Sequence, residues 1–186
     1  MKKMSTLFKV DYHKKGEPGV IYNEIRPENM WVIEEAGVIA TQKFDGSACA
    51  IIKGILYKRF DAKVGKNIPA GAIPCQEPDP ISLHHPHWVK VNQELPQDKY
   101  FLEAFHNLTD KIDGTYELCG PKVGSNRENL SKHQLIKHGS VVIPTNDYSF
   151  NNIYGILKSM DIEGIVFHGS DNKMCKIRKS DFGLKR

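Results

Sequence analysis

The sequence predicts a strand-rich α+β domain with antiparallel sheets and flanking helices. Three observations favour this class: short apolar runs with strand-like alternation, turn-forming residues between pairs of those runs, and one amphipathic stripe near the carboxy-terminal end. At 186 residues, the chain is long enough for one good core and too short for two full-sized domains. We therefore expect a single domain over residues 1–186.

The first half of the chain predicts a short helix and a hairpin. Residues 27–35 open with proline and end before a glycine, which is typical of a short helix. Residues 47–52 and 55–60 are strand-like runs, and the Lys53-Gly54 pair between them predicts a tight turn.

The middle of the chain predicts a long loop and two further strands. Residues 61–98 are rich in proline and show little periodicity, which indicates a structured loop, and a loop of that length is usually functional. Residues 100–105 and 115–119 have strand-like patterns. Apolar residues then recur at helical spacing over 149–159, and either Ser149 or Asp147 can cap that helix.

The last two strand-like runs predict a hairpin with a charged face. Residues 163–168 and 173–178 flank four turn-forming residues. Pairing across a four-residue turn places Glu163 opposite Arg178, with Lys176 on the same face because side chains alternate along a strand. An exposed cross-strand ion pair, worth about 0.2–1 kcal/mol, is the simpler interpretation of these residues.

The composition is that of an ordinary globular protein. Hydrophobic residues make up 40% and charged residues 26%, and the net charge of +4 is compatible with a polyanionic partner without requiring one. The apolar runs are too short to span a membrane, and the amino terminus lacks a signal-peptide pattern. The four cysteines are far apart and form no CxxC pair. We therefore expect a cytoplasmic protein without a membrane partner.

Residues 41–47, TQKFDGS, raise a specific question because they place a lysine, an aspartate and a glycine between two apolar runs. One interpretation is an ordinary Asp-Gly turn with a solvated lysine. The other is an inward-facing lysine whose amine is needed for chemistry. The rest of the sequence favours the second.

Four short motifs occur in a fixed order: KFDG at 43–46, YEL at 116–118, EGIV at 163–166 and KIR at 176–178. Together they resemble motifs I, III, IV and V of the covalent nucleotidyltransferase superfamily, which comprises polynucleotide ligases and messenger-RNA capping enzymes. A KxDG motif alone is a weak signal, whereas four motifs in order on strand-like segments are a specific one.

Longer segments narrow the resemblance. Residues 74–80, 88–91, 113–129 and 133–139 are similar to the small ATP-dependent 5′-to-3′ RNA ligases of animals and of some phages and bacteria. The similarity runs from about Arg26 to the carboxy terminus. It implies a minimal nucleotidyltransferase domain of the ATP-grasp-like ligase adenylation type, with no separate OB-fold domain.

The resemblance implies catalytic roles for two lysines. Lys43 would attack the α-phosphate of ATP and become a lysyl-AMP, so we expect burial and neighbouring cations around it. Lys176 would contact the α-phosphate and offset charge in the transition state. Glu163 would help to bind Mg²⁺, a hard cation that prefers oxygen ligands.

The resemblance also implies nucleotide contacts for a second group of residues. Glu117 would accept hydrogen bonds from the ribose hydroxyls, with Glu103 as a less favoured rival for this role. Gly46 would let backbone approach the nucleotide, and Asp45 would hold that loop. The remaining candidates are Arg59, for ribose or a 5′-phosphate, and Arg178, for phosphate.

The implied function is RNA ligation, with ATP and Mg²⁺ as cofactors and RNA bearing a 5′-phosphate and a 3′-hydroxyl as partner. The alternatives are a DNA ligase, a capping enzyme, or a non-catalytic module that binds RNA or a nucleotide. A zinc site at Cys75 and the histidines of 84–87 is disfavoured because paired CxxC and HxxxH spacings are missing. A polar loop over the mouth of the active site is the better interpretation of that segment. The alternative is a loop that recognises RNA ends, with an unpaired base stacked on Trp88 or a histidine.

Overall fold

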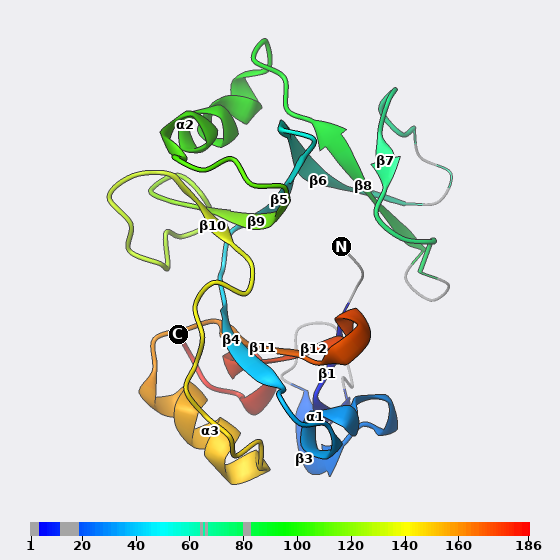
Figure 1. Ribbon diagram of the computed structural model, residues 1–186, viewed down its shortest axis with the longest axis vertical. Helices are drawn as coiled ribbons and strands as arrows, with labels where there is room; N and C mark the ends of the chain where they lie inside the picture. Colours follow the sequence, from blue (N-terminus) through cyan, green and yellow to red (C-terminus); the bar gives the residue numbers. More distant parts are fainter. Residues whose placement is uncertain (1–3, 12–18, 64, 66, 80–82) are drawn as a thin grey trace. The chain divides into compact units, whose positions relative to one another are not determined.

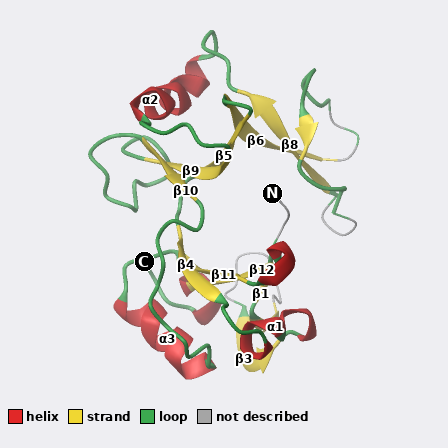
Figure 2. Ribbon diagram, in the orientation of Figure 1, coloured by secondary structure: helices red, strands yellow, loops and turns green. Residues whose placement is uncertain are grey.

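The computed structural model describes residues 4–11, 19–63, 65, 67–79 and 83–186 (Figure 1). The described residues form a mixed α+β fold with several antiparallel sheets and few helices (Figure 2). They divide into two compact units. The inserted unit is drawn from residues 45–138, and the split unit from residues 4–44 and 139–186.

The split unit is built on a sheet with strand order β1-β12-β11-β4. Strand β11 pairs antiparallel with both β12 and β4, whereas β1 runs parallel to β12. Strands β2 and β3 pair separately and antiparallel. The strands are β1 (Ser5–Thr6), β2 (Phe8–Asp11), β3 (Val20–Ile25), β4 (Ile39–Lys43), β11 (Gly164–His168) and β12 (Met174–Arg178).

Helix α3 supplies much of the split unit's core. It spans Phe150–Ser159, and Ser149 caps it by accepting a hydrogen bond from the Asn152 amide at 3.4 Å. Ile153 and Leu157 are fully buried and pack with one face of the sheet, represented by Ile165 and Phe167. The shorter helical segments are η1 (Pro27–Asn29), α1 (Trp31–Glu34), η3 (Ser170–Asn172) and η4 (Lys179–Phe182).

The inserted unit has its own sheet and its own core. The strand order is β10-β9-β5-β6-β8-β7, with antiparallel pairing throughout. Helix α2 (Lys99–Asn107) follows the 3-10 turn η2 (Pro96–Asp98) and packs on the core around Ile51 and Leu118. The strands are β5 (Ser47–Ile52), β6 (Ile55–Lys63), β7 (Ile73–Pro74), β8 (His84–Lys90), β9 (Gly114–Cys119) and β10 (Gln134–Lys137).

The predicted hairpin between β5 and β6 is confirmed. Lys53 and Gly54 have φ values of 52° and 73°, as a two-residue turn with the twist of the flanking strands requires. The Asp113 carboxylate accepts both turn amides, at 2.6 Å from Lys53 and 3.0 Å from Gly54. These hydrogen bonds hold the pKa of Asp113 below its usual value.

Two predictions for the middle of the chain are wrong. The predicted strand over 100–105 is part of helix α2, because Phe101, Ala104, Phe105 and Leu108 recur at helical spacing and turn toward the inserted unit's core. The predicted loop over 61–98 contains the end of β6 and the whole of β7 and β8. Residues 64, 66 and 80–82 of that segment lie outside the described residues.

The predicted register of the last hairpin is wrong by one residue. Lys173 belongs to the connection, so His168 pairs with Met174 and Arg178 pairs with Gly164 instead of Glu163. The connection contains the 3-10 turn η3, in which Asp171 has a φ of 52°. The backbone amide of Lys173 closes this turn by donating to the Ser170 carbonyl at 3.0 Å. The extra residue changes which side chains meet across the strands.

Candidate functional site

One face of the split unit's sheet gathers the basic residues that the sequence singles out. Alternate residues of a strand share a face, and the registers of β4, β11 and β12 align three basic side chains on the side opposite the core. The rows across this face are Lys43, Gly164 and Arg178, and next to them Thr41, Val166 and Lys176.

Lys43 pairs with Glu163 at the end of β4. Its ammonium donates to the Glu163 carboxylate and also to the Phe44 carbonyl, the latter at 3.4 Å. The two side chains are 21% and 23% exposed. The Lys43 side chain is therefore mostly shielded from solvent beside a carboxylate, while its role as an inward-facing nucleophile stays a prediction.

Gly164 allows the strands beside Lys43 to approach closely. A Cβ atom at this position would lie 2.3 Å from the Ile177 carbonyl oxygen and 2.9 Å from the Arg178 Cα. Contacts this short are with backbone, which cannot move aside cheaply. The glycine of the EGIV motif is therefore required by the packing of β11 against β12.

Lys176 lies in a setting that disfavours its charge. Burial lowers the pKa of its ammonium below the ordinary value of 10.5, and the nearby cations Arg178 and Lys43 lower it further. The carboxylates of Glu163 and Asp181 oppose this effect. The half-buried Lys176 side chain and the Lys43 ammonium are therefore close enough to repel each other.

Arg178 is held by a carboxylate that the sequence reasoning passed over. Its guanidinium donates to Asp181 at 2.7 Å (Nη2 to Oδ1) and 3.3 Å (Nε to Oδ2), and its amide donates to Oδ2 at 2.9 Å. Asp181 is only 2% exposed. The spacing of three residues between an arginine and an aspartate after a strand is the signal that points to this pair.

Glu117 is the centre of a second polar group, which lies in the inserted unit. Its Oε1 accepts the Gly46 amide at 3.2 Å, and its Oε2 lies 2.9 Å from His138 Nε2. Gly46 approaches β9 so closely that a Cβ atom there would lie 2.2 Å from the Leu118 carbonyl oxygen. The glycine of the KFDG motif thus lets the chain reach the Glu117 carboxylate.

Arg59 and Glu117 share a face of the inserted unit's sheet. The registers of β5 with β6 and of β5 with β9 place Tyr57, Ala50 and Thr115 in one row, and Arg59 and Glu117 each lie two residues from that row on their own strands. Arg59 pairs with Asp61 at 2.9 Å and stands across from Trp88 on β8. The sheet therefore places both predicted nucleotide contacts of this unit on one face.

Asp45 lies on a loop that a further glutamate holds. Its amide donates to Glu128 Oε1 at 3.0 Å, and its carboxylate lies 3.5 Å from the Arg127 Nε. Two glutamates, Glu117 and Glu128, thus accept the consecutive amides of Asp45 and Gly46. Glu128 lies in the segment of family resemblance at 113–129, but its role there cannot be found from spacing.

Glu103 does not occupy a strand, so the pattern that makes it a rival to Glu117 is absent. It lies on helix α2, and its carboxylate is 3.0 Å from His133 Nδ1. The other nitrogen of His133 accepts the Lys122 amide at 3.3 Å, and its ring stacks on Tyr100 at 4.2 Å. Glu103 therefore supports a buried histidine.

The predicted site residues fall into two groups. In the split unit the structure brings together Lys43, Glu163, Lys176 and Arg178. In the inserted unit it brings Gly46 to Glu117 and aligns Arg59 on the same face. The KFDG motif crosses from one unit to the other, because Phe44 belongs to the split unit and Asp45 to the inserted unit.

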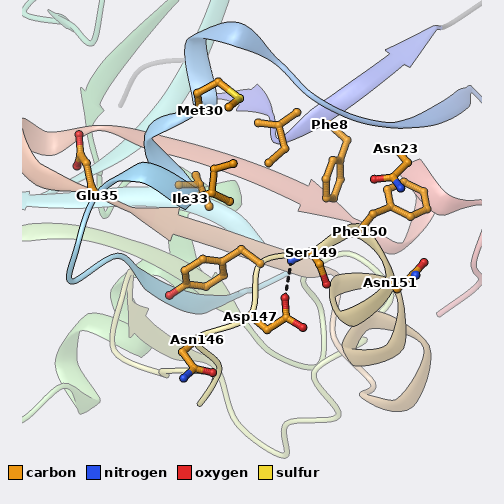
Figure 3. Close-up of a pocket in the computed structure, with 13 residues that line it drawn as sticks. Phe8, Asn23, Met30, Ile33, Glu35, Asn146, Asp147, Ser149, Phe150 and Asn151 are labelled. Atoms are coloured by element: carbon orange, nitrogen blue, oxygen red, sulfur yellow. Dashed lines mark hydrogen bonds between the residues drawn. The ribbon is translucent and has the colours of Figure 1, made fainter.

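A cavity of about 700 Å³ in the split unit lies apart from these groups. Figure 3 shows its lining, which includes Phe8, Met30, Ile33 and Phe150 together with the Asp147 carboxylate that accepts the Ser149 amide. None of the predicted site residues lines it. A smaller cavity of about 410 Å³ in the inserted unit does include Arg59, beside Lys58 and its buried partner Asp98.

The donor set of the split unit fits a phosphate ligand and Mg²⁺. Lysine and arginine cations suit phosphate oxygens, and Mg²⁺ is commonly bound by one or two carboxylates together with substrate phosphates. Within the described ranges, no three His, Cys, Asp or Glu side chains cluster closely enough to hold a metal ion by themselves. Glu163 is the carboxylate of this group, and its magnesium role stays a prediction.

The helices of the described segments are too short or too polar to cross a membrane. Compared with protein-family models and with curated proteins, the chain matches none.

Proposed function

We propose that this protein is an ATP-dependent RNA ligase that forms a covalent lysyl-AMP at Lys43. The observation that carries the proposal is the convergence of Lys43, Lys176 and Arg178 on one sheet face, with Glu163 paired to Lys43. An amine nucleophile beside cations suits attack on a phosphate, where negative charge builds up in the transition state. The four ordered motifs and the longer resemblance add the substrate class.

In the first step, the neutral Lys43 amine attacks the α-phosphorus of ATP. The Nζ–P bond forms as the P–O bond to pyrophosphate breaks. Pyrophosphate leaves, and Nζ gives up one proton to solvent. Lys176 stabilises the charge on the α-phosphate oxygens, and Asp181 keeps the Arg178 guanidinium in position beside it. Bound at Glu163 and at phosphate oxygens, Mg²⁺ would neutralise part of the phosphate charge.

The next two steps transfer and release AMP. The 5′-phosphate of the RNA displaces Lys43 from the phosphorus of the lysyl-AMP, which gives an adenylated RNA end and returns the free amine. A 3′-hydroxyl then attacks the 5′-phosphate, forms the phosphodiester and expels AMP. The ribose role of Glu117, the 5′-phosphate role of Arg59 and the single nucleotidyltransferase domain stay predictions from the resemblance.

The first step can be tested by intact-protein mass spectrometry after incubation with Mg²⁺ and either ATP or GTP. We expect a mass gain of one AMP with ATP, and none in Lys43→Ala. Lys9→Ala is the matched control, since Lys9 is an exposed strand lysine of the same unit, and it should keep the adduct.

Other outcomes would redirect the proposal. An adduct that persists in Lys43→Ala, with folding unchanged, would show that another residue is the nucleophile. A gain of GMP from GTP would favour capping chemistry. If folded protein gains no mass with either nucleotide, a non-catalytic binding module becomes the better interpretation. DNA and RNA acceptors, supplied to the adenylated protein, distinguish the two kinds of ligase.

A further inference from the structure

His138 stands beside Glu117, and neither the motifs nor the proposed mechanism gives it a role. It directly follows β10, where its amide donates to the Thr115 carbonyl at 3.0 Å and so continues the pairing of β10 with β9. Thr115 and Glu117 are two residues apart on β9 and therefore share a face. The pairing thus places the imidazole against both side chains.

The imidazole bridges the two side chains. His138 Nδ1 lies 3.0 Å from Thr115 Oγ1, and Nε2 lies 2.9 Å from Glu117 Oε2. An ionised carboxylate can only accept hydrogen bonds, so Nε2 must carry the proton and donate. In the neutral imidazole, Nδ1 then accepts from the threonine hydroxyl. This relay fixes the tautomer and the orientation of the ring.

The bridge also fixes the Glu117 carboxylate. Oε2 is bonded to the histidine and Oε1 to the Gly46 amide, so the carboxylate plane is held at both ends. A carboxylate offers about four acceptor sites, and these two bonds use one site on each oxygen. A second site on each oxygen suits a pair of neighbouring hydroxyls.

We propose that His138 is a positioning residue that orients Glu117 to read the ribose hydroxyls of the nucleotide and thereby sets the preference for a ribonucleotide. The inference rests on the proposed function, because it assumes that Glu117 contacts ribose. If His138 acts through Glu117, replacing His138 should slow adduct formation only with nucleotides that carry the ribose hydroxyls.

A comparison within the same unit separates this role from plain packing. His133 is enclosed, with 7% of its side chain exposed, and it stacks on Tyr100. His138 keeps 25% of its side chain exposed, next to a carboxylate with 12% exposed. The first histidine is built into the core region, whereas the second lies where a ligand can reach its partner.

The test uses the full chain and measures kcat/KM for adduct formation with ATP, 2′-deoxy-ATP and 3′-deoxy-ATP. For wild type we expect ATP to be the best substrate. His138→Ala should lose about tenfold or more with ATP, the usual effect of losing a hydrogen bond to a charged group. Its loss with the deoxy analogue that lacks the contacted hydroxyl should be much smaller.

Two conservative variants sharpen the test. His138→Gln places an amide nitrogen near the position of Nε2 and should restore most of the ATP preference. His138→Asn places its amide near the position of Nδ1, keeps the Thr115 side of the relay only, and should behave like His138→Ala. The matched control is His133→Ala, which should lower the thermal midpoint and leave the ratio of ATP to deoxy-ATP unchanged.

Several results would overturn the inference. If His138→Ala lowers kcat/KM equally for all three nucleotides, the ratio of ATP to deoxy-ATP stays unchanged and the role of His138 is structural only. A wild-type enzyme without ribose preference would show that Glu117 does not read the hydroxyls. In each of these cases the adduct still forms, so the proposed function stands. A wild type that forms no adduct and binds no AMP by calorimetry fails the proposed function, and this inference falls with it.

Discussion

At the scale of single residues, the split unit keeps an unfavourable charge next to its proposed nucleophile. Lys176 is half-buried, and Arg178 and Lys43 lower its pKa further. Its protonated form is therefore less stable in the folded chain than in the unfolded chain. A site that must stabilise charge on a substrate commonly carries such a cost, because stability and activity favour different side chains there.

The first prediction concerns this lysine. Lys176→Met removes the charge but keeps a long apolar chain, and we expect the free energy of unfolding at pH 7 to rise by about 0.5–2 kcal/mol. The same variant should slow adduct formation about 100-fold, as the loss of a transition-state cation does. Chemical denaturation and mass spectrometry measure the two effects.

The sign of the pH dependence follows from the lowered pKa. Between the folded pKa of Lys176 and its ordinary value of 10.5, the unfolded chain binds more protons, so wild-type stability rises with pH. The advantage of Lys176→Met should shrink over that window. Lys173→Met is the control, because Glu35 raises the pKa of Lys173, and this variant should gain no stability. A constant advantage across the window would contradict the assignment.

The sequence identified residues better than it identified their partners. Lys43, Lys176 and Arg178 were expected near one another, and they share a face. Asp181 was not expected beside Arg178, because the three-residue spacing that links them is a weak signal in one sequence. Partners that meet through tertiary structure, such as His138 and Glu117, leave no spacing signal in one sequence.

At the scale of elements, two glycines have different structural roles, one in the packing of a strand and the other in a helix. Gly164 lies on β11, where a Cβ atom would meet backbone at 2.3 Å. Gly155 lies on α3, where a Cβ atom would have no atom of the described residues within 4 Å beyond its own helix backbone and chain neighbours. The same substitution should therefore act in opposite directions at these two sites.

We expect Gly164→Ala to destabilise the protein by about 1–3 kcal/mol, as overpacking does. Gly155→Ala should stabilise it by about 0.5–1 kcal/mol, because alanine is the better helix former. Urea unfolding of both variants gives the comparison. Equal effects of one sign would show that the close approach of β11 to β12 relaxes without cost.

Local signals explain which elements could be predicted. The β5–β6 hairpin and helix α3 are marked by turn residues, caps and periodicity within a few residues of each other, and the structure has both. Helix α2 was missed because a short aromatic-rich run fits both periods, and only packing against the inserted unit's core decides between them. The hairpin register failed because a 3-10 turn added one residue to the connection.

At the scale of the whole chain, each unit has its own core and its own tryptophan. Trp31 belongs to the core of the split unit and is 8% exposed, and Trp88 lies on β8 of the inserted unit and is 6% exposed. The sequence contains two tryptophans. In Trp88→Phe the remaining Trp31 reports on the split unit, and in Trp31→Phe the remaining Trp88 reports on the inserted unit.

We expect Ile153→Ala to lower the stability reported by Trp31 by about 2–5 kcal/mol, because it leaves a cavity in the split unit's core. The transition reported by Trp88 should move less. Ile51→Ala, in the other core, should give the converse pattern. Fluorescence-detected denaturation of the single-tryptophan variants measures both, and equal shifts of both reporters would mean that the units unfold as one.

Chain length predicts one good core, whereas the described residues contain two core clusters, one in each unit, and the single domain stays a prediction. The reason is that partition into units depends on long-range strand pairing, such as β1 with β12, which composition and periodicity do not record. The division also passes through the KFDG motif, which no local pattern marks as a boundary.

This connectivity sets an order for folding during synthesis. The inserted unit can close its sheet as soon as β10 has left the ribosome, whereas the split unit cannot complete its sheet until β11 and β12 follow. At about 5–20 residues per second, that interval lasts several seconds. A nascent chain therefore carries Lys43 without its Glu163 partner, and the charged face assembles only after translation has passed β12.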